Sequence, residues 1–176
     1  MLMAKSKTDS KLKIVVLAGG ISHERDISLK SARRVADALT EKGAQVIMRE
    51  PDADLLANLK KDAPDVIWPV LHGASGEDGA LREILSFTGI PFVGADSASA
   101  KLSWDKSIAK ILVAKAGIQT PRSITLPRET FKELDASSVL KLVATSLALP
   151  VVVKPARAGS APVSYTHLTL PTNREV

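Results

Sequence analysis

The chain has 176 residues, of which 45% are hydrophobic and 24% are charged, and its formal net charge is +5. This length and composition predict a soluble protein of one domain, or of one domain and part of a second. No apolar run approaches the roughly 20 residues that a membrane helix needs, and the first residues do not read as a secretory signal. The absence of cysteine excludes disulfides and agrees with a cytoplasmic location. Lysines are scattered rather than interleaved with aromatic residues, which argues against a nucleic acid partner.

Strand and helix patterns alternate from the first apolar run onward. Lys13–Ala18 is predicted to be a buried parallel strand, because its apolar run ends in Gly-Gly. A helix should follow, with Ser28 as its N-cap and Gly43 beyond its last turn. Its apolar residues recur at helical spacing, at Leu29, Ala32, Val35, Ala36 and Leu39.

The same alternation continues to about residue 94. Further strands are predicted at Gln45–Met48, Val66–Val70 and Ile90–Val93, and helices at Leu55–Leu59 and Ala80–Phe87. This succession predicts an α/β fold with a doubly wound parallel sheet. In such sheets ligands bind at the carboxyl ends of the strands.

The pattern changes between residues 100 and 120, where we place a domain boundary. Residues 1–11 are expected to be a flexible tail, 12–100 a substrate-binding α/β domain, and 101–161 the start of a second domain. The expected elements of that second domain are a helix at Ser103–Ala116, an extended segment at Arg122–Leu126, a helix at Ser137–Leu147 and a buried strand at Val151–Val153.

Pro162–Val176 breaks the composition of everything before it. It holds the chain's only tyrosine, Tyr165, and one of its three histidines, His167. We interpret it as translated cloning sequence that stays unpacked, with a genuine variable tail as the alternative.

Charged and imidazole side chains follow two of the predicted strands. After Gly19-Gly20, the carboxylate of Glu24 can bind an ammonium group or can serve only as an acidic charge at a helix entry. After the second strand comes His72, and a lone histidine is more often structural than catalytic. The glycines that follow it, Gly73, Gly76 and Gly79, suit a loop whose backbone approaches a ligand.

Two acidic residues in the second loop, Glu77 and Asp78, suggest a metal site. The better interpretation is that they are N-terminal charges of the following helix.

Cationic and glycine-rich positions in the second part point to an anion. Lys154 ends an apolar strand before Pro155, and a lysine that emerges from a buried strand needs an anion such as a nucleotide phosphate. Arg157–Ser160 is predicted to be a loop whose N–H groups hold anions. No Gly-x-Gly-x-x-Gly and no Walker A pattern is present, so the common dinucleotide and P-loop fingerprints are not met.

Four motifs in this order resemble the D-alanine–D-alanine ligase family of the ATP-grasp superfamily. They are Gly-Gly-Ile-Ser-His-Glu-Arg-Asp-Ile-Ser-Leu, Leu-His-Gly with Gly-Glu-Asp-Gly, Asp-Lys at 105–106, and Lys-Pro with Gly-Ser from Lys154. The resemblance covers about residues 12–161 and implies ATP-dependent joining of two D-alanines through an acyl phosphate, for peptidoglycan synthesis. It departs from the family pattern at Pro162 and Val163, where we place the foreign join.

The resemblance also implies roles for individual residues. Glu24 would hold the α-ammonium of the first D-alanine, His72 would lie near its carboxylate, and Ser160 would hydrogen-bond to that glutamate. The ATP phosphates would be bound by Lys106, Lys154 and Gly159. For Lys106 this assignment depends on the resemblance, because a lysine on an amphipathic helix is otherwise solvated.

Further expectations follow from the family. Mg²⁺ is expected, with its ligands in the part of the family beyond residue 161, so that this chain alone would be an inactive fragment. The full-length parent is expected to be a homodimer. One alternative is a related ligase that makes a D-alanyl-D-lactate ester or another D-amino-acid dipeptide. A second alternative is a non-catalytic flavodoxin-like binding module.

Overall fold

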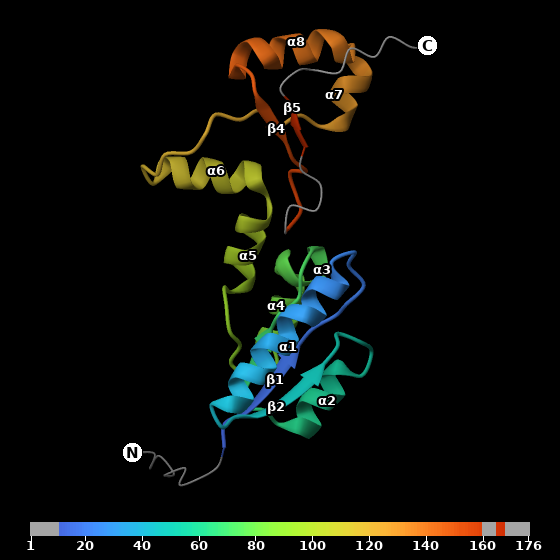
Figure 1. The fold of residues 1–176 in the computed structure, drawn as a ribbon, viewed down its shortest axis with the longest axis vertical. Coiled ribbons are helices and arrows are strands. Elements are labelled where there is room, and N and C mark those ends of the chain that lie inside the picture. The colour runs from blue at the N-terminus through green and yellow to red at the C-terminus, as the bar shows by residue number, and fades with distance from the viewer. Residues whose placement is uncertain (1–10, 160–164, 168–176) are drawn as a thin grey trace. The chain divides into compact units, whose positions relative to one another are not determined.

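The structure is a computed structural model that describes residues 11–159 and 165–167 (Figure 1). The chain forms two compact units, Met1–Lys101 and Leu102–Val176. Within the described ranges, no helix is both long enough and apolar enough to cross a membrane.

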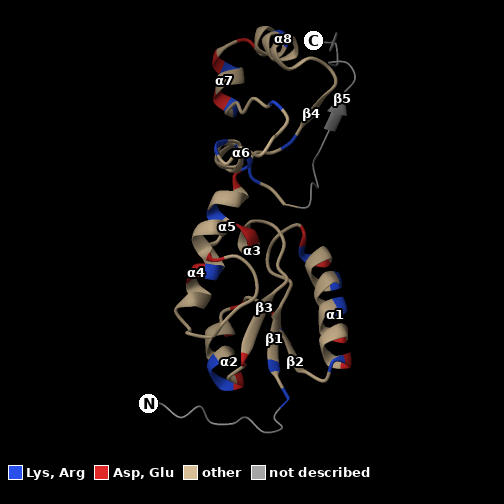
Figure 2. Cartoon of the chain, turned by 90° about the vertical axis from the view of Figure 1, so that its left-hand side faces the viewer, with Lys and Arg blue, Asp and Glu red and all other residues tan. Residues whose placement is uncertain are grey.

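A parallel sheet forms the centre of the first unit. Its strands are β1 (Lys13–Leu17), β2 (Gln45–Arg49) and β3 (Val66–Pro69), in the order β2-β1-β3. Figure 2 shows α1 (Arg25–Glu41) on one side of this sheet, with α2 (Leu55–Asp62) and α4 (Ala80–Ser86) on the other. The predicted doubly wound α/β fold is therefore confirmed.

Side chains of β1 alternate between the two faces of the sheet and so belong to two core clusters. Val15 and Leu17 pack with Leu55, Leu59 and Leu85 from α2 and α4. Ile14 and Val16 pack with Ala32 of α1 on the opposite face. Because both faces are covered, β1 reads as a continuous apolar run rather than as an alternating one.

Ser28 does not cap α1, contrary to prediction. The helix begins at Arg25, with Glu24 at the N-cap position, so Ser28 lies inside its first turns and is fully buried. Its hydroxyl accepts a hydrogen bond from the Gly19 amide at 2.9 Å and donates one to the Val70 carbonyl at 2.6 Å. The ends of β1 and β3 thus supply its partners. Gly43 follows the last turn at φ +89°, as predicted.

The predicted strand at Ile90–Val93 forms only a single parallel bridge, between Ile67 and Phe92. Ile67 donates to the Pro91 carbonyl and Val93 donates to the Ile67 carbonyl, each at 2.9 Å. Pro91 has no N–H to extend the ladder, which limits the pairing. The single turn of helix α3 (Ala74–Glu77) was not predicted, because it has no apolar residues at helical spacing.

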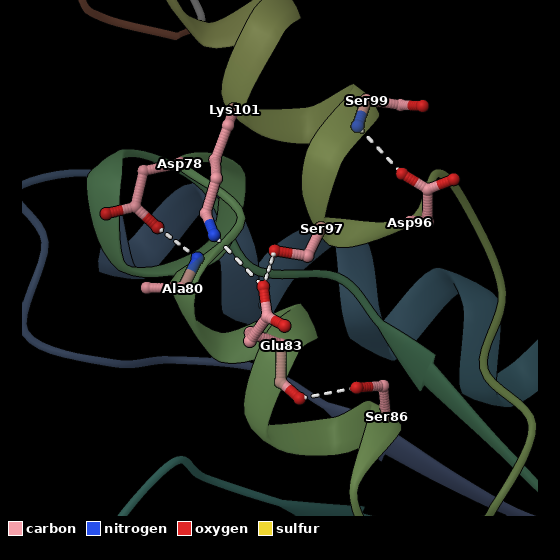
Figure 3. Close-up of polar contacts among 8 residues, drawn as sticks. All are labelled: Asp78, Ala80, Glu83, Ser86, Asp96, Ser97, Ser99 and Lys101. Carbon is pink, nitrogen blue, oxygen red and sulfur yellow. Dashed lines mark hydrogen bonds and ion pairs between the residues drawn. The ribbon is translucent and has the colours of Figure 1, made fainter.

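Polar contacts join α4 to the beginning of α5 (Ser97–Trp104), as Figure 3 shows. Glu83 accepts hydrogen bonds from Ser97 Oγ at 2.6 Å and from Lys101 Nζ at 3.0 Å. The Ser97 hydroxyl, followed by the Lys101 ammonium, lowers the pKa of the Glu83 carboxyl below its ordinary value. Asp96 accepts from the Ser99 amide at 2.7 Å, which satisfies a free N–H at the start of α5.

The second unit contains three helices and two short strands in its described part. The helices are α6 (Lys106–Lys115), α7 (Arg128–Glu133) and α8 (Ala136–Leu147), and the antiparallel strands are β4 (Val151–Val153) and β5 (Tyr165–His167). The sequence did not predict α7. The single helix predicted at Ser103–Ala116 is also wrong, because Asp105 interrupts it with extended backbone (φ −91°, ψ 108°) and caps α6 with its own side chain.

The strand β4 is not buried as predicted, since Val152 and Val153 are 52% and 54% exposed. Within the described residues it pairs with β5 alone, and a two-stranded sheet cannot cover both of its faces. The prediction of an unpacked tail is wrong at Tyr165–His167, which form β5. Tyr and Thr favour strands, and the edge of β4 offers unpaired backbone groups. The interpretation of residues 162–176 as added sequence stays a prediction.

Candidate functional site

Two loops lie side by side at the carboxyl edge of the sheet in the first unit. They follow β1 and β3, which pair in parallel with Leu17 opposite Pro69. A Cβ added to Gly73 would lie 3.8 Å from Glu24 Oε1 and would overlap Ser22 Oγ, so the two loops are in contact. The structure therefore brings Glu24 together with the segment His72-Gly73, as the rule on strand ends predicts.

Glu24 is a buried carboxylate, with only 6% of its surface exposed. It stands at the N-cap position of α1, but its side chain makes no capping hydrogen bond. Its Oε2 atom is buried and has no hydrogen-bond partner among the described residues. A buried carboxylate is costly unless it is paired, so this atom fits a cationic ligand better than the role of a helix cap.

His72 lies in the second loop, and its imidazole contacts Glu77. The distance from His72 Nδ1 to Glu77 Oε1 is 3.7 Å, and the side chain of His72 is 25% exposed. Glu77 Oε2 also accepts a hydrogen bond from the Gly73 amide at 3.2 Å. Glu77 thus braces the loop that carries His72, a contact that the sequence pattern did not reveal.

Asp78 contacts the helix that follows it. Its Oδ1 atom accepts a hydrogen bond from the Ala80 amide at 2.8 Å (Figure 3). This contact agrees with the interpretation of Asp78 as an N-terminal charge of α4.

The glycines of the second loop are packed closely against other parts of the chain, and their predicted approach to a ligand stays a prediction. A Cβ on Gly76 would lie 2.8 Å from the Leu71 carbonyl carbon, and one on Gly79 would lie 2.5 Å from the Ser97 carbonyl oxygen. Gly73 faces Ser22 in the same way. The close approaches in the structure are therefore to the chain itself.

An ion pair that the sequence did not reveal joins the first loop to the end of β2. Arg25 Nη2 lies 2.6 Å from Glu50 Oε1, and the Glu50 carboxylate packs against Gly19. The two charged residues are 25 positions apart, so no local pattern predicts the contact.

In the second unit, the start of α6 holds the segment that follows β4. Lys106 Nζ donates to the Ala158 carbonyl at 2.6 Å, and the Lys106 amide donates to the Ala156 carbonyl at 3.0 Å. Arg157 Nε donates to Asp105 Oδ2 at 2.9 Å. Lys106 therefore lies beside the segment that leads to Gly159.

Two predicted site residues remain, Lys154 and Ser160, and the described part of the chain gives no contact of either with the other site residues. Lys154 is exposed, so its ammonium is accessible to water and does not require the anion predicted for a lysine on a buried strand. Ser160 lies outside the described residues.

Asp105 is held in its charged form by its neighbours. The Ser107 hydroxyl and the Arg157 guanidinium keep the pKa of its carboxyl well below the ordinary 3.8. Its contribution to stability is therefore fully present above pH 3.8 and is lost as the pH falls below that value. We expect Asp105→Asn to lower the melting temperature at pH 7, and this deficit to shrink as the pH falls below 3.8. Thermal melting followed by circular dichroism between acid and neutral pH measures this difference.

The matched control is Asp37→Asn, the same change at an exposed position on α1. It should leave the dependence of melting on pH unchanged. A deficit for Asp105→Asn that stays constant across the acid range would contradict the assigned ion pair.

Comparison with known proteins points to one family. Residues 49–95 match the family model described as the D-ala D-ala ligase N-terminus. The D-alanine--D-alanine ligase of Pelagibacter ubique is 39% identical over 149 residues, which cover 85% of this chain and 48% of that protein. The ligase of Moorella thermoacetica is 40% identical over 153 residues, with the same two coverages. The chain thus spans about half the length of these curated relatives.

Solved structures agree with the sequence matches. A D-alanine--D-alanine ligase from Bacillus anthracis superposes with a TM-score of 0.71 at 27% identity, over 90% of this chain and 50% of that one. The VanG D-Ala:D-Ser ligase from Enterococcus faecalis gives a TM-score of 0.66 at 28% identity, over 92% of this chain and 57% of that one. By sequence and by fold, the chain is similar to about half the length of D-alanine–D-alanine ligases, including the N-terminal domain of that family.

Proposed function

We propose that this chain carries the first-substrate site of an ATP-dependent D-alanine–D-alanine ligase that serves peptidoglycan synthesis. A free carboxylate is a poor acyl donor, so it must be activated. In the proposed reaction the carboxylate of the first D-alanine takes the γ-phosphoryl group of ATP, giving an acyl phosphate and ADP. The amine of the second D-alanine then attacks the acyl carbon, the amide bond forms and phosphate leaves.

The observation that carries this proposal is the buried carboxylate of Glu24. Its Oε2 atom has no hydrogen-bond partner among the described residues, and its Oε1 atom lies next to Gly73 in the loop of His72. An α-ammonium group would donate a charge-assisted hydrogen bond to Oε2. In this arrangement the substrate carboxylate would lie towards His72, whose imidazole is only partly exposed.

Binding of the ATP phosphates is proposed for the second unit, at Lys106, Lys154 and the segment that contains Gly159 and Ser160. The hydrogen bond from Lys106 Nζ to the Ala158 carbonyl supports this, because the ammonium lies at the residue before Gly159. A Bacillus anthracis relative has been solved in complex with ATP.

Within the described part of the chain, no group of three His, Asp or Glu side chains fits a metal ion. We therefore assign no step to Mg²⁺ on these residues.

The test is phosphate release by the full-length protein that contains this chain. We expect release that requires both ATP and D-alanine, no release with L-alanine, and D-alanyl-D-alanine as the product identified by mass. Residues 1–176 alone should release phosphate only at background. Full-length protein that releases no phosphate in response to D-alanine would overturn the proposed function.

The identity of the second substrate is a separate question. The similarity to a D-Ala:D-Ser ligase shows that this fold is found with another second substrate. Competition among D-alanine, D-serine and D-lactate in the same assay, with the product identified by mass, distinguishes the alternatives. In each of them the first substrate is D-alanine, so the role proposed for Glu24 is unchanged.

A further inference from the structure

Ser28 ties together the two loops that carry Glu24 and His72. It lies within α1, one turn after Glu24, and none of its surface is exposed. Its hydroxyl oxygen accepts from the Gly19 amide at 2.9 Å and donates to the Val70 carbonyl at 2.6 Å. Its own amide donates to the Glu24 carbonyl at 3.0 Å.

These contacts fall where the chain leaves the sheet. Gly19 begins the loop that leads to Glu24, and Val70 stands two residues before His72. A hydroxyl is needed at this point, because it must accept from one backbone group and donate to another at the same time. Alanine could do neither, and it would leave a buried N–H and a buried carbonyl without this partner.

We propose that Ser28 is a positioning residue for the first substrate. Its hydroxyl fixes the distance between the loop of Glu24 and the loop of His72, so that the side chains of Glu24 and His72 can hold one amino acid. The inference rests on the proposed function and adds to it a residue that does not touch the substrate.

Other contacts hold the surrounding fold, so the role of the Ser28 hydroxyl is local. The Val70 amide donates to the Leu17 carbonyl at 2.8 Å, and the Ala18 amide donates to the Arg49 carbonyl at 3.0 Å. The helix packs on the sheet through apolar side chains such as Ala32 and Val35. Loss of the hydroxyl should therefore free the beginnings of the loops while the strands and α1 stay in place.

The kinetic test uses Ser28→Ala in the full-length protein. We expect the KM for D-alanine to rise by about tenfold or more, as for loss of a buried hydrogen bond. The KM for ATP should stay within about twofold of its original value. Ser28→Thr, which keeps the hydroxyl, should restore most of the D-alanine KM.

The matched control is Val35→Ala on the same helix. It removes apolar contact with the sheet and should lower the melting temperature, yet leave the KM for D-alanine unchanged. If both alanine variants raise this KM equally, the effect is general destabilisation and the positioning role is overturned.

A second measurement needs no activity and uses the 176-residue chain. Hydrogen exchange at the Gly19 amide should be about tenfold faster in Ser28→Ala, while the adjacent Ala18 amide keeps its rate. Equal exchange of Gly19 in both proteins would overturn the assigned bond.

Failure of the positioning role and failure of the proposed function give different results. An active full-length protein whose D-alanine KM is unchanged by Ser28→Ala overturns the positioning role alone. A full-length protein that does not use D-alanine overturns the proposed function, and the positioning role with it.

Discussion

Replacement of Glu24 by glutamine in the full-length protein should raise the KM for D-alanine by roughly 10- to 150-fold. This range corresponds to about 1.5–3 kcal/mol for the loss of a hydrogen bond to a charged group. Glutamine keeps the shape of the side chain but removes the negative charge that would attract the α-ammonium. The KM for ATP should change little, because the proposed phosphate contacts involve other residues. Steady-state kinetics with each substrate varied in turn measures both values.

The matched control is Glu41→Gln, the same change at the other end of α1, where the side chain is exposed. It should leave both KM values unchanged. An unaltered D-alanine KM in Glu24→Gln would show that Glu24 is only an acidic charge at the helix entry, which is the alternative that the sequence leaves open.

The fold of the first unit could be predicted because its signals are local. The apolar run of β1 and the helical spacing in α1 each lie within a few consecutive residues, and they were sufficient for strand, helix and topology. Contacts between distant residues were not predictable in this way. Asp105 pairs with Arg157, 52 positions later, and this contact accompanies the break between α5 and α6.

The same distinction between local signals and contacts of distant residues applies to the candidate site. That the loops of Glu24 and His72 adjoin follows from a general rule about parallel sheets. The hydrogen bonds that hold these loops do not follow from that rule, since they join residues that are far apart in the sequence. A serine near a helix start predicts a cap, but Ser28 instead meets the ends of two strands. That Glu24 and His72 act on a substrate stays a prediction.

Gly76→Ala should destabilise the first unit by about 1–3 kcal/mol, the usual range for overpacking a filled interior. In the middle of a helix, alanine is ordinarily favoured over glycine by roughly 0.5–1 kcal/mol. Whether the substitution stabilises or destabilises the unit therefore depends on the space available for the added methyl group. Gly76 lies in α3, and a Cβ there would come within 2.8 Å of the Leu71 carbonyl carbon and oxygen. Since Leu71 is buried and leads directly to His72, its backbone cannot yield without moving the loop.

Two measurements on the 176-residue chain test this prediction: the melting temperature, and the NMR signals of the His72 ring. Both should change in Gly76→Ala. Gly89→Ala is the control, because Gly89 has open space around it and a φ of +69°, so that backbone strain alone acts there. It should lower the melting temperature without shifting the His72 signals. A Gly76→Ala protein that melts normally and keeps its His72 signals would show that this loop is not braced through Leu71.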